Sequence, residues 1–301
     1  MTLNRLHYLI LTTSIVLVSS ARSADFISPP PWSNQINSDI KRFISEDEIR
    51  PLLVDEVEFI SLYRQHMAPQ QRGVALIIPD WQHLPTNNAG INFLRKELND
   101  VGYATIATTI PDIDWLAVDK ADSENDDTDA ASSTEEPAAD VNQTQEITHA
   151  EASPAVSNAI IDHYKSNLIA RFNALYQSAS NEQGKIIVVA QGASAGLLLE
   201  HFASFPRTNI DAFISLSSYL PNQQRNQNLN ASLSTISPPL LDIYYSVDNP
   251  DLTHSVEQRK RWVRRNSKYD YRQRELFGLP AQPEQHQRLL KEIDGFLRRL
   301  F

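Results

Sequence analysis

The sequence predicts an α/β fold, in which a mostly parallel, doubly wound sheet is covered by helices on both faces. Short, continuously apolar runs at 73–79 and 185–190 are typical of strands buried on both faces. Segments of amphipathic, helical spacing separate these runs, and this alternation indicates parallel strands joined by crossover helices. No repeat of solenoid length is present.

Composition excludes several classes of site. The 301 residues contain no cysteine, which excludes a disulfide framework, cysteine catalysis and thiolate metal sites. No apolar span beyond the N-terminus is long enough to cross a membrane. We expect no cofactor and no metal ion.

Residues 1–24 are expected to be a cleaved secretory signal peptide. Arg5 supplies the positive charge, an apolar core follows at 9–18, and small residues at 19–21 permit cleavage. The alternative is an N-terminal membrane anchor, for which this core is short. The prediction is therefore a periplasmic or secreted protein with one domain, residues 25–301.

An acidic insertion interrupts this domain at about 119–152. Residues 119–151 carry eleven Asp or Glu and one Lys, a net charge of −10 that equals that of the whole chain. The rest of the chain is therefore close to neutral, and binding to nucleic acid is not expected. The segment has almost no large apolar residue, which predicts a disordered loop. It lacks the glycine-punctuated spacing of a calcium loop.

In the N-terminal half of the domain, the sequence predicts two short helical or irregular segments, three strands and one helix. Segments 38–43 and 46–53 mix charged and apolar residues and are expected to be short helical or irregular structure. Strands are expected at 59–63, 73–79 and 103–110. Between the last two, apolar residues at helical spacing predict a helix over 92–101, and Gly102 suits its C-terminal cap.

The C-terminal half continues the alternation. Apolar spacing predicts a helix over 157–176, and buried strands are expected at 209–216 and 240–247. A polar loop is expected at 222–230 and a basic helix at 258–268. A polar, alternating run at 268–276 suits a strand at the sheet edge, and 285–300 is an amphipathic helix.

The most informative stretch, 185–200, predicts a buried strand, a tight turn of small residues and a helix. Its turn, 192–196, matches G-x-S-x-G, the pattern of a sharp bend that exposes a nucleophilic serine, here Ser194. A second register of the same turn places Gly192 at the nucleophile position. Both registers remain open, and Gln191 would need hydrogen-bond partners if it lies in the buried strand.

Two further residues complete a candidate triad. Asp248 follows the strand at 240–247, and His286 lies where the last helix starts. The chain order Ser194, Asp248, His286 is that of nucleophile, acid and base in one large hydrolase class. Ser194 would attack an acyl carbonyl, His286 would transfer its proton, and Asp248 would orient the imidazole. The amide of Ala195, with one near Asp80 or Trp81, would hold the oxyanion.

From about residue 59 to the end, the chain resembles the α/β-hydrolases. More narrowly, it is similar to a family of uncharacterised exported bacterial proteins with this fold. The segments that carry the resemblance are FISLYRQ, GVALIIPDWQHLP, FLRKELNDVGYATIATTIPD and IIVVAQGASA. The resemblance implies the α/β-hydrolase fold, and the narrower family tends to carry glycine at the nucleophile position, which favours the second register.

Two functions follow from these observations. The first is an exported serine hydrolase that cleaves an acyl ester through Ser194, His286 and Asp248. The second is a catalytically inactive α/β-hydrolase-fold protein that serves in binding or envelope interaction. Asp242 is a rival acid within its strand, and His83 is a candidate ligand contact. A further expectation is contact with anionic lipid through the basic residues Arg259, Lys260, Arg261, Arg264, Arg265 and Lys268.

Overall fold

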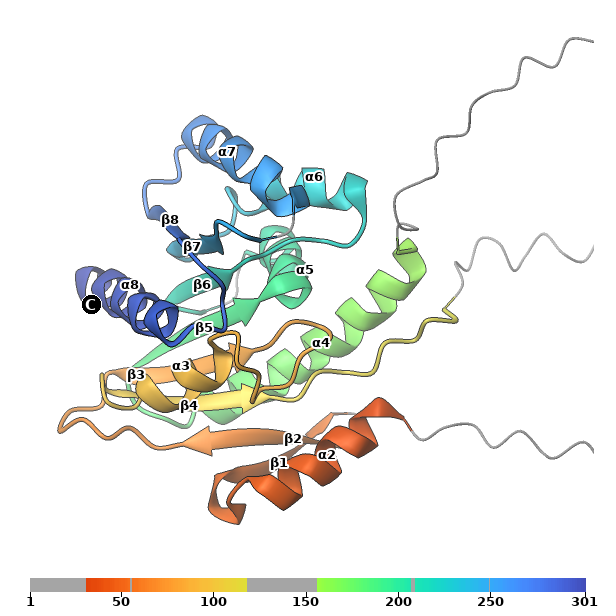
Figure 1. Cartoon of the computed structure of the whole chain (residues 1–301), viewed down its shortest axis with the longest axis vertical. Coiled ribbons are helices and arrows are strands. Elements are labelled where there is room, and N and C mark those ends of the chain that lie inside the picture. Colours follow the sequence, from red (N-terminus) through yellow and green to blue (C-terminus); the bar gives the residue numbers. More distant parts are fainter. Residues whose placement is uncertain (1–30, 55, 118–155, 207–208, 249) are drawn as a thin grey trace, which may run out of the picture. The chain divides into compact units, whose positions relative to one another are not determined.

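The computed structural model describes residues 31–54, 56–117, 156–206, 209–248 and 250–301 (Figure 1). The predicted signal peptide and the acidic insertion at 119–152 lie outside the described residues, so both stay predictions. Within the described ranges, no helix has the length and apolar character needed to cross a membrane.

An eight-stranded sheet forms the centre of the fold, in the order β1-β2-β4-β3-β5-β6-β7-β8. From β4 to β8 every neighbouring pair is parallel, whereas β1 and β2 add an antiparallel edge. The strands are β1 (Ile49–Val54), β2 (Val57–Arg64), β3 (Gly73–Ile78), β4 (Tyr103–Thr108), β5 (Lys185–Gln191), β6 (Ala212–Leu216), β7 (Leu240–Tyr245) and β8 (Tyr271–Leu276).

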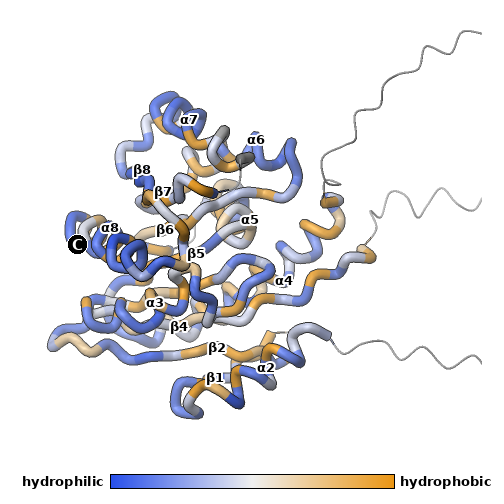
Figure 2. Tube along the Cα trace, in the orientation of Figure 1, coloured by the Kyte–Doolittle hydropathy of each residue, from blue (hydrophilic) through white to orange (hydrophobic). Residues whose placement is uncertain are grey.

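Helices cover both faces of this sheet, as the sequence predicts. Because side chains alternate along a strand, Leu76 packs into the core beneath one helical layer and Ile77 into the core beneath the other. Hydrophobic colour follows the strands and hydrophilic colour the outer helices in Figure 2. One layer contains α4 (Asn158–Ala179), α5 (Gly192–Ser204), α6 (Gln223–Ser232) and α7 (Pro250–Arg265); the other contains α2 (Trp32–Phe43), α3 (Ile91–Glu97) and α8 (Pro283–Leu300).

Two of the predicted elements are wrong. Residues 222–230, expected to be a loop, lie almost entirely in α6, because the Asn222 side chain caps the Arg225 amide and Leu229 is buried. Residues 46–53 contain a single 3₁₀ turn (Glu46–Glu48) and then β1, which pairs along its whole length with β2. Pro51 is tolerated there because an edge strand has one side that needs no partner.

A buried ion pair fastens α7 to the sheet. Arg259, fully buried, donates through Nη1 to both Asp242 carboxylate oxygens at 2.9 and 3.2 Å, and through Nη2 to the Ser218 carbonyl at 2.6 Å. Tyr271 donates its hydroxyl to the same carboxylate at 2.8 Å. Asp242 is therefore a structural residue, and Arg259 does not belong to an exposed basic face.

The remaining basic residues of the predicted lipid contact divide into two sets. Lys268 is also engaged, because its ammonium donates to the carbonyl oxygens of Ile236 and Pro238. Contact with anionic lipid stays a prediction for the residues that remain exposed on α7, which are Lys260, Arg261, Arg264 and Arg265.

Replacing Arg259 by methionine should lower the free energy of unfolding by about 3–5 kcal/mol, because the Asp242 carboxylate stays buried without its cation. Urea denaturation of the full chain measures this loss. The matched control is Arg265→Met on the exposed side of α7, which removes only a contact with the Trp262 ring and should cost less than about 1 kcal/mol. Equal losses in both variants would contradict the assigned role.

Candidate functional site

The bend between β5 and α5 carries glycine, not serine, at its tip. Gly192 has φ 58°, in the left-handed region that residues with a side chain rarely adopt. It follows directly on the last residue of β5, and α5 begins with it. The structure therefore has the second register of the motif, with Gly192 where a hydrolase of this type would present its nucleophile.

The carboxylate of Asp80 lies directly over this glycine. Asp80 Oδ1 accepts the backbone N–H of Trp81 at 2.8 Å and that of Ala193 at 2.7 Å. A Cβ placed on Gly192 would be 2.2 Å from Asp80 Cγ, so no other residue fits there while Asp80 keeps this position. We refer to the amides of Trp81 and Ala193 as the amide pair.

The amide pair has the composition of an oxyanion hole. One amide belongs to the residue after the elbow tip and the other to the loop after β3, the two donors that α/β-hydrolases use. The sequence predicted an oxyanion donor near Asp80 or Trp81 together with Ala195, whereas the structure pairs the Trp81 amide with that of Ala193, because the register differs. Asp80 is buried, and the start of α5 adds a favourable dipole for its negative charge.

Ser194 lies in the first turn of α5 and is fully buried. Its hydroxyl is 3.1 Å from the hydroxyl of Tyr164 on α4. Burial raises the pKa of Tyr164 far above that of a free tyrosine, so this phenol stays protonated and offers Ser194 no base. The role of Ser194 as nucleophile at the bend has no support in this geometry.

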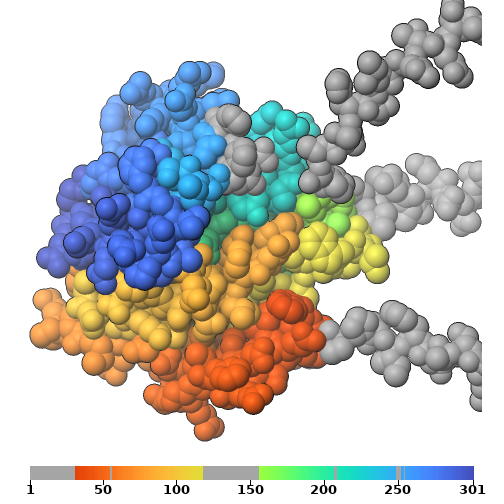
Figure 3. Space-filling model, in the orientation of Figure 1, coloured from red at the N-terminus to blue at the C-terminus, as the bar shows by residue number. Residues whose placement is uncertain are grey.

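His286 connects two loops. It stands near the start of α8, which lies beside α3 although the two are far apart in the sequence (Figure 3). Its Nε2 is 2.9 Å from the carbonyl oxygens of both Asn88 and Pro280, and its ring stacks against Phe93 at 5.2 Å. Since carbonyl oxygens only accept, Nε2 must carry the proton and donate it. A general base needs that nitrogen unprotonated and directed at the nucleophile.

Asp248 faces a serine from the neighbouring strand end. Its Oδ2 accepts the Ser217 hydroxyl and the Tyr245 amide, both at 2.6 Å. Burial raises the pKa of the Asp248 carboxyl above its ordinary value, against the lowering effect of these hydrogen bonds. Ser217 has φ 51°, so the strand end is held in an unusual conformation for this contact.

The structure does not bring the three predicted site residues together. Among the described residues, Ser194, His286 and Asp248 each bond to other groups, and no hydrogen bond joins one of them to another. Within the same residues, no cluster of three or more His, Asp or Glu side chains could hold a metal ion.

The sequence analysis named Asp80 only as the neighbour of a backbone donor and missed the role of its carboxylate. The available signal was the position of Asp80 at the end of a buried strand. Its hydrogen bond with Ala193 joins residues 113 positions apart, so no local sequence pattern indicates it. Gln191 does find the partners that its burial requires. Its amide accepts from Asn87 and donates to the Ala89 carbonyl, at 3.3 and 3.2 Å, which fastens the elbow to this loop.

His83 lies near Asp80 Oδ2, the carboxylate oxygen that does not accept the two amides. Its Nδ1 is 3.5 Å from Asp80 Oδ2, and its side chain is half exposed. The hydrogen bond to Asp80 raises the pKa of His83 above 6.5, against the opposite effect of partial burial. Trp81 also contacts Tyr164, at 5.9 Å between ring centroids, so this loop packs on α4.

Comparison with known proteins places this arrangement in context. The profile of a family described as "Protein of unknown function (DUF3530)" matches residues 13–299. Among curated proteins, none matches the sequence.

Several solved structures are similar to this chain. Est1E from Butyrivibrio proteoclasticus has a TM-score of 0.55 and 10% identity, over 84% of this chain and 98% of that one. A dienelactone hydrolase from Anabaena variabilis has a TM-score of 0.53 and 13% identity, over 83% of this chain and 96% of that one. A soluble variant of monoglyceride lipase from Saccharomyces cerevisiae has a TM-score of 0.52 and 10% identity, over 84% of this chain and 95% of that one. At these identities the likeness establishes the fold alone, which confirms the predicted α/β-hydrolase fold.

Gly192→Ala should destabilise the protein by about 3 kcal/mol, because the methyl group meets Asp80 and the backbone keeps a positive φ. Asp80→Ala should cost about 2 kcal/mol through the loss of two charge-assisted bonds. In the double variant the overlap is gone, so the alanine at 192 should cost only about 1 kcal/mol. A denaturant double-mutant cycle in carboxylate-free buffer measures this coupling; strictly additive losses would contradict the contact.

The His83–Asp80 contact predicts a pH dependence of stability. Because the folded pKa of His83 is raised, its stabilising contribution is complete below the unfolded value of about 6.5 and is lost as pH rises through the folded value. His83→Gln should remove this part of the pH profile. Asp80→Asn should shift the NMR titration of the His83 ring to lower pH, and an unchanged titration would refute the pairing.

Proposed function

The chain belongs to the family described as "Protein of unknown function (DUF3530)", and we propose that it is a non-catalytic binding protein built on the α/β-hydrolase fold. One observation carries this proposal. The Asp80 carboxylate occupies the amide pair, over a glycine that offers no nucleophile.

Occupation of the amide pair bears directly on acyl transfer. In a serine hydrolase the two amides are left open for the negative oxygen that develops on the attacked carbonyl. Here a carboxylate oxygen accepts both N–H groups at 2.7 and 2.8 Å, distances typical of hydrogen bonds to a charged acceptor. A substrate carbonyl would have to displace an anion that the same donors already stabilise.

The competing hypothesis is the acyl-ester hydrolase that uses Ser194, His286 and Asp248. It would require Ser194 to exchange its contact with Tyr164 for an exposed position, and His286 to release two carbonyl oxygens. The names of the dienelactone hydrolase and the lipase with similar folds favour this hypothesis only by analogy. The contacts of the described residues therefore favour the binding protein.

The location of the protein is part of the same proposal. We place it in the periplasm or outside the cell, on the basis of the signal-like residues 1–24. A binding or envelope-interaction role fits a protein of that location. Fractionation of cells, with N-terminal sequencing of the mature chain, tests both the export and the cleavage.

An active-site fluorophosphonate probe should not label the full-length protein above the background of a Ser194→Ala variant. Hydrolysis of p-nitrophenyl acetate by the two proteins should also be equal, because Ser194 contacts the Tyr164 hydroxyl and, among the described residues, no base. A serine esterase of known activity serves as the positive control in both assays. Labelling at Ser194 that disappears in His286→Ala would overturn the proposal and establish the hydrolase.

A further inference from the structure

A hollow lies beside α4, and no residue of the elbow lines it. It has a volume of about 390 Å³ and is enclosed by α4, the segment after β4 and the end of the β1–β2 hairpin. We refer to it as the Arg171 cavity. Its apolar wall is formed by Val54, Val57, Phe59, Pro111, Ile113 and Ala170.

Arg171 is the cation of this cavity. Its Nη1 donates to the carbonyl and hydroxyl oxygens of Thr109, at 2.8 and 3.2 Å, and its guanidinium carbon lies 4.9 Å from the centre of the Phe59 ring. Burial lowers the pKa of Arg171 to about 10. Among the described residues it pairs with no carboxylate, and Nη1 is the only nitrogen that donates.

The two acids near the cavity have donors of their own. Both carboxylate oxygens of Asp112 are held by Ser33, at 2.8 Å from its amide and 2.6 Å from its hydroxyl. Asp114 is exposed and accepts the Leu116 amide at 3.1 Å. The partly buried Arg171 therefore has N–H groups that a ligand in the cavity could use, whereas the acids at the edge disfavour a second negative charge.

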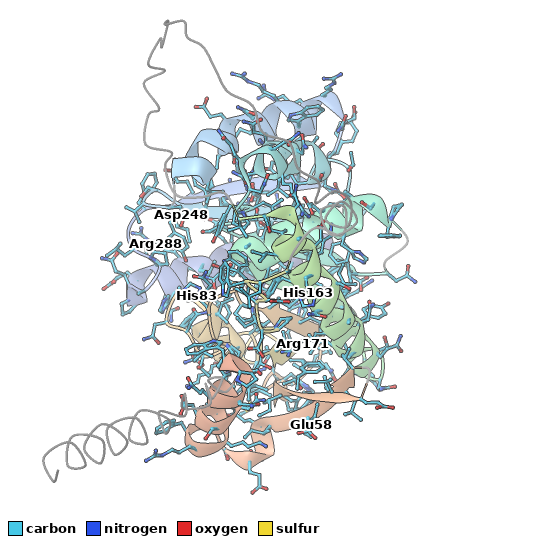
Figure 4. The ribbon with its side chains drawn as sticks, turned by 90° about the vertical axis from the view of Figure 1, so that its right-hand side faces the viewer. Glu58, His83, His163, Arg171, Asp248 and Arg288 are labelled. Carbon is cyan, nitrogen blue, oxygen red and sulfur yellow. The ribbon has the colours of Figure 1, made fainter. Side chains whose placement is uncertain are left out.

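The mouth of the cavity is polar. His163 and Asn167 line it from α4 and are exposed. Figure 4 labels His163 and Arg171 along the face of α4 that is turned to the viewer. An apolar wall, one partly buried cation and a polar mouth are the usual components of a small-molecule site of this volume.

From this combination we infer that the Arg171 cavity binds an organic monoanion, a carboxylate or sulfonate attached to an apolar or aromatic body. Arg171 donates its free N–H groups to the anionic head, and the body lies against Phe59 and the aliphatic wall. The planar guanidinium of arginine can donate two parallel hydrogen bonds to a carboxylate or sulfonate, which the ammonium of a lysine cannot do. This inference concerns a site separate from Gly192 and Asp80, and it stands or falls independently of the proposed function.

The test is isothermal titration calorimetry of the full-length protein with 2-naphthoate. It should bind saturably, and Arg171→Gln should weaken it by about tenfold or more, because the charge-assisted bonds are lost. The neutral 2-naphthylmethanol should bind the wild type more weakly, and it should not distinguish the wild type from Arg171→Gln. The dianion 2,6-naphthalenedicarboxylate should bind more weakly than 2-naphthoate.

Two more variants keep the test decisive. Ala170→Leu retains the charge but fills the cavity, so it should also abolish binding even if Arg171→Gln folds poorly. Arg265→Gln removes an exposed arginine elsewhere and should leave the affinity unchanged. Absence of saturable 2-naphthoate binding to the wild type, or equal affinity of the wild type and Ala170→Leu, would overturn the inference.

Discussion

The hydrogen bonds of the Asp80 carboxylate to the amides of Trp81 and Ala193 decide the chemistry of this fold. They place a fixed negative charge where an α/β-hydrolase holds a transient one. They also require a glycine at 192, because any Cβ there would overlap the carboxylate. A single carboxylate therefore contacts both the glycine at the elbow tip and the amide pair, so a substitution at 192 alone would leave the amide pair occupied.

Two other predicted catalytic residues form hydrogen bonds that connect neighbouring segments of the chain. His286 joins the loop at Asn88 to the segment at Pro280, and Asp248 joins the ends of β6 and β7 through Ser217. Gln191 fastens the elbow to the same loop that His286 holds. The carboxyl edge of the sheet is consequently braced by polar contacts, whereas in a triad the same types of side chain are directed at a substrate.

The fold was predictable because its signals are local. Continuous apolar runs such as 73–78 identify strands buried on both faces, and the stripe on α8 identifies a helix against the sheet. The errors fall where local signals are weak. Residues 222–230 are too polar to be recognised as a helix, and β1 carries a proline that only its edge position permits.

The candidate site was less predictable because its register depends on a distant residue. The turn 192–196 satisfies the serine motif in one register and the glycine elbow in the other, with the same small residues on both sides. What separates them is the position of Asp80 in three dimensions, more than a hundred residues away in the chain. Neither spacing nor composition carries that information.

The buried Arg259 and the partly buried Arg171 differ in whether the protein itself supplies an anion for the guanidinium. Arg259 meets Asp242 and Ser218 within the protein, so its charge needs nothing from outside. Within the described part of the chain, Arg171 donates only to the neutral oxygens of Thr109, and it borders a hollow with an apolar wall. Partial burial weakens the hydration of the Arg171 guanidinium, so an anionic ligand in the cavity would gain a stronger interaction with it than in open water. The proposed small-molecule site at Arg171 is therefore separate from the elbow, where Asp80 occupies the amide pair.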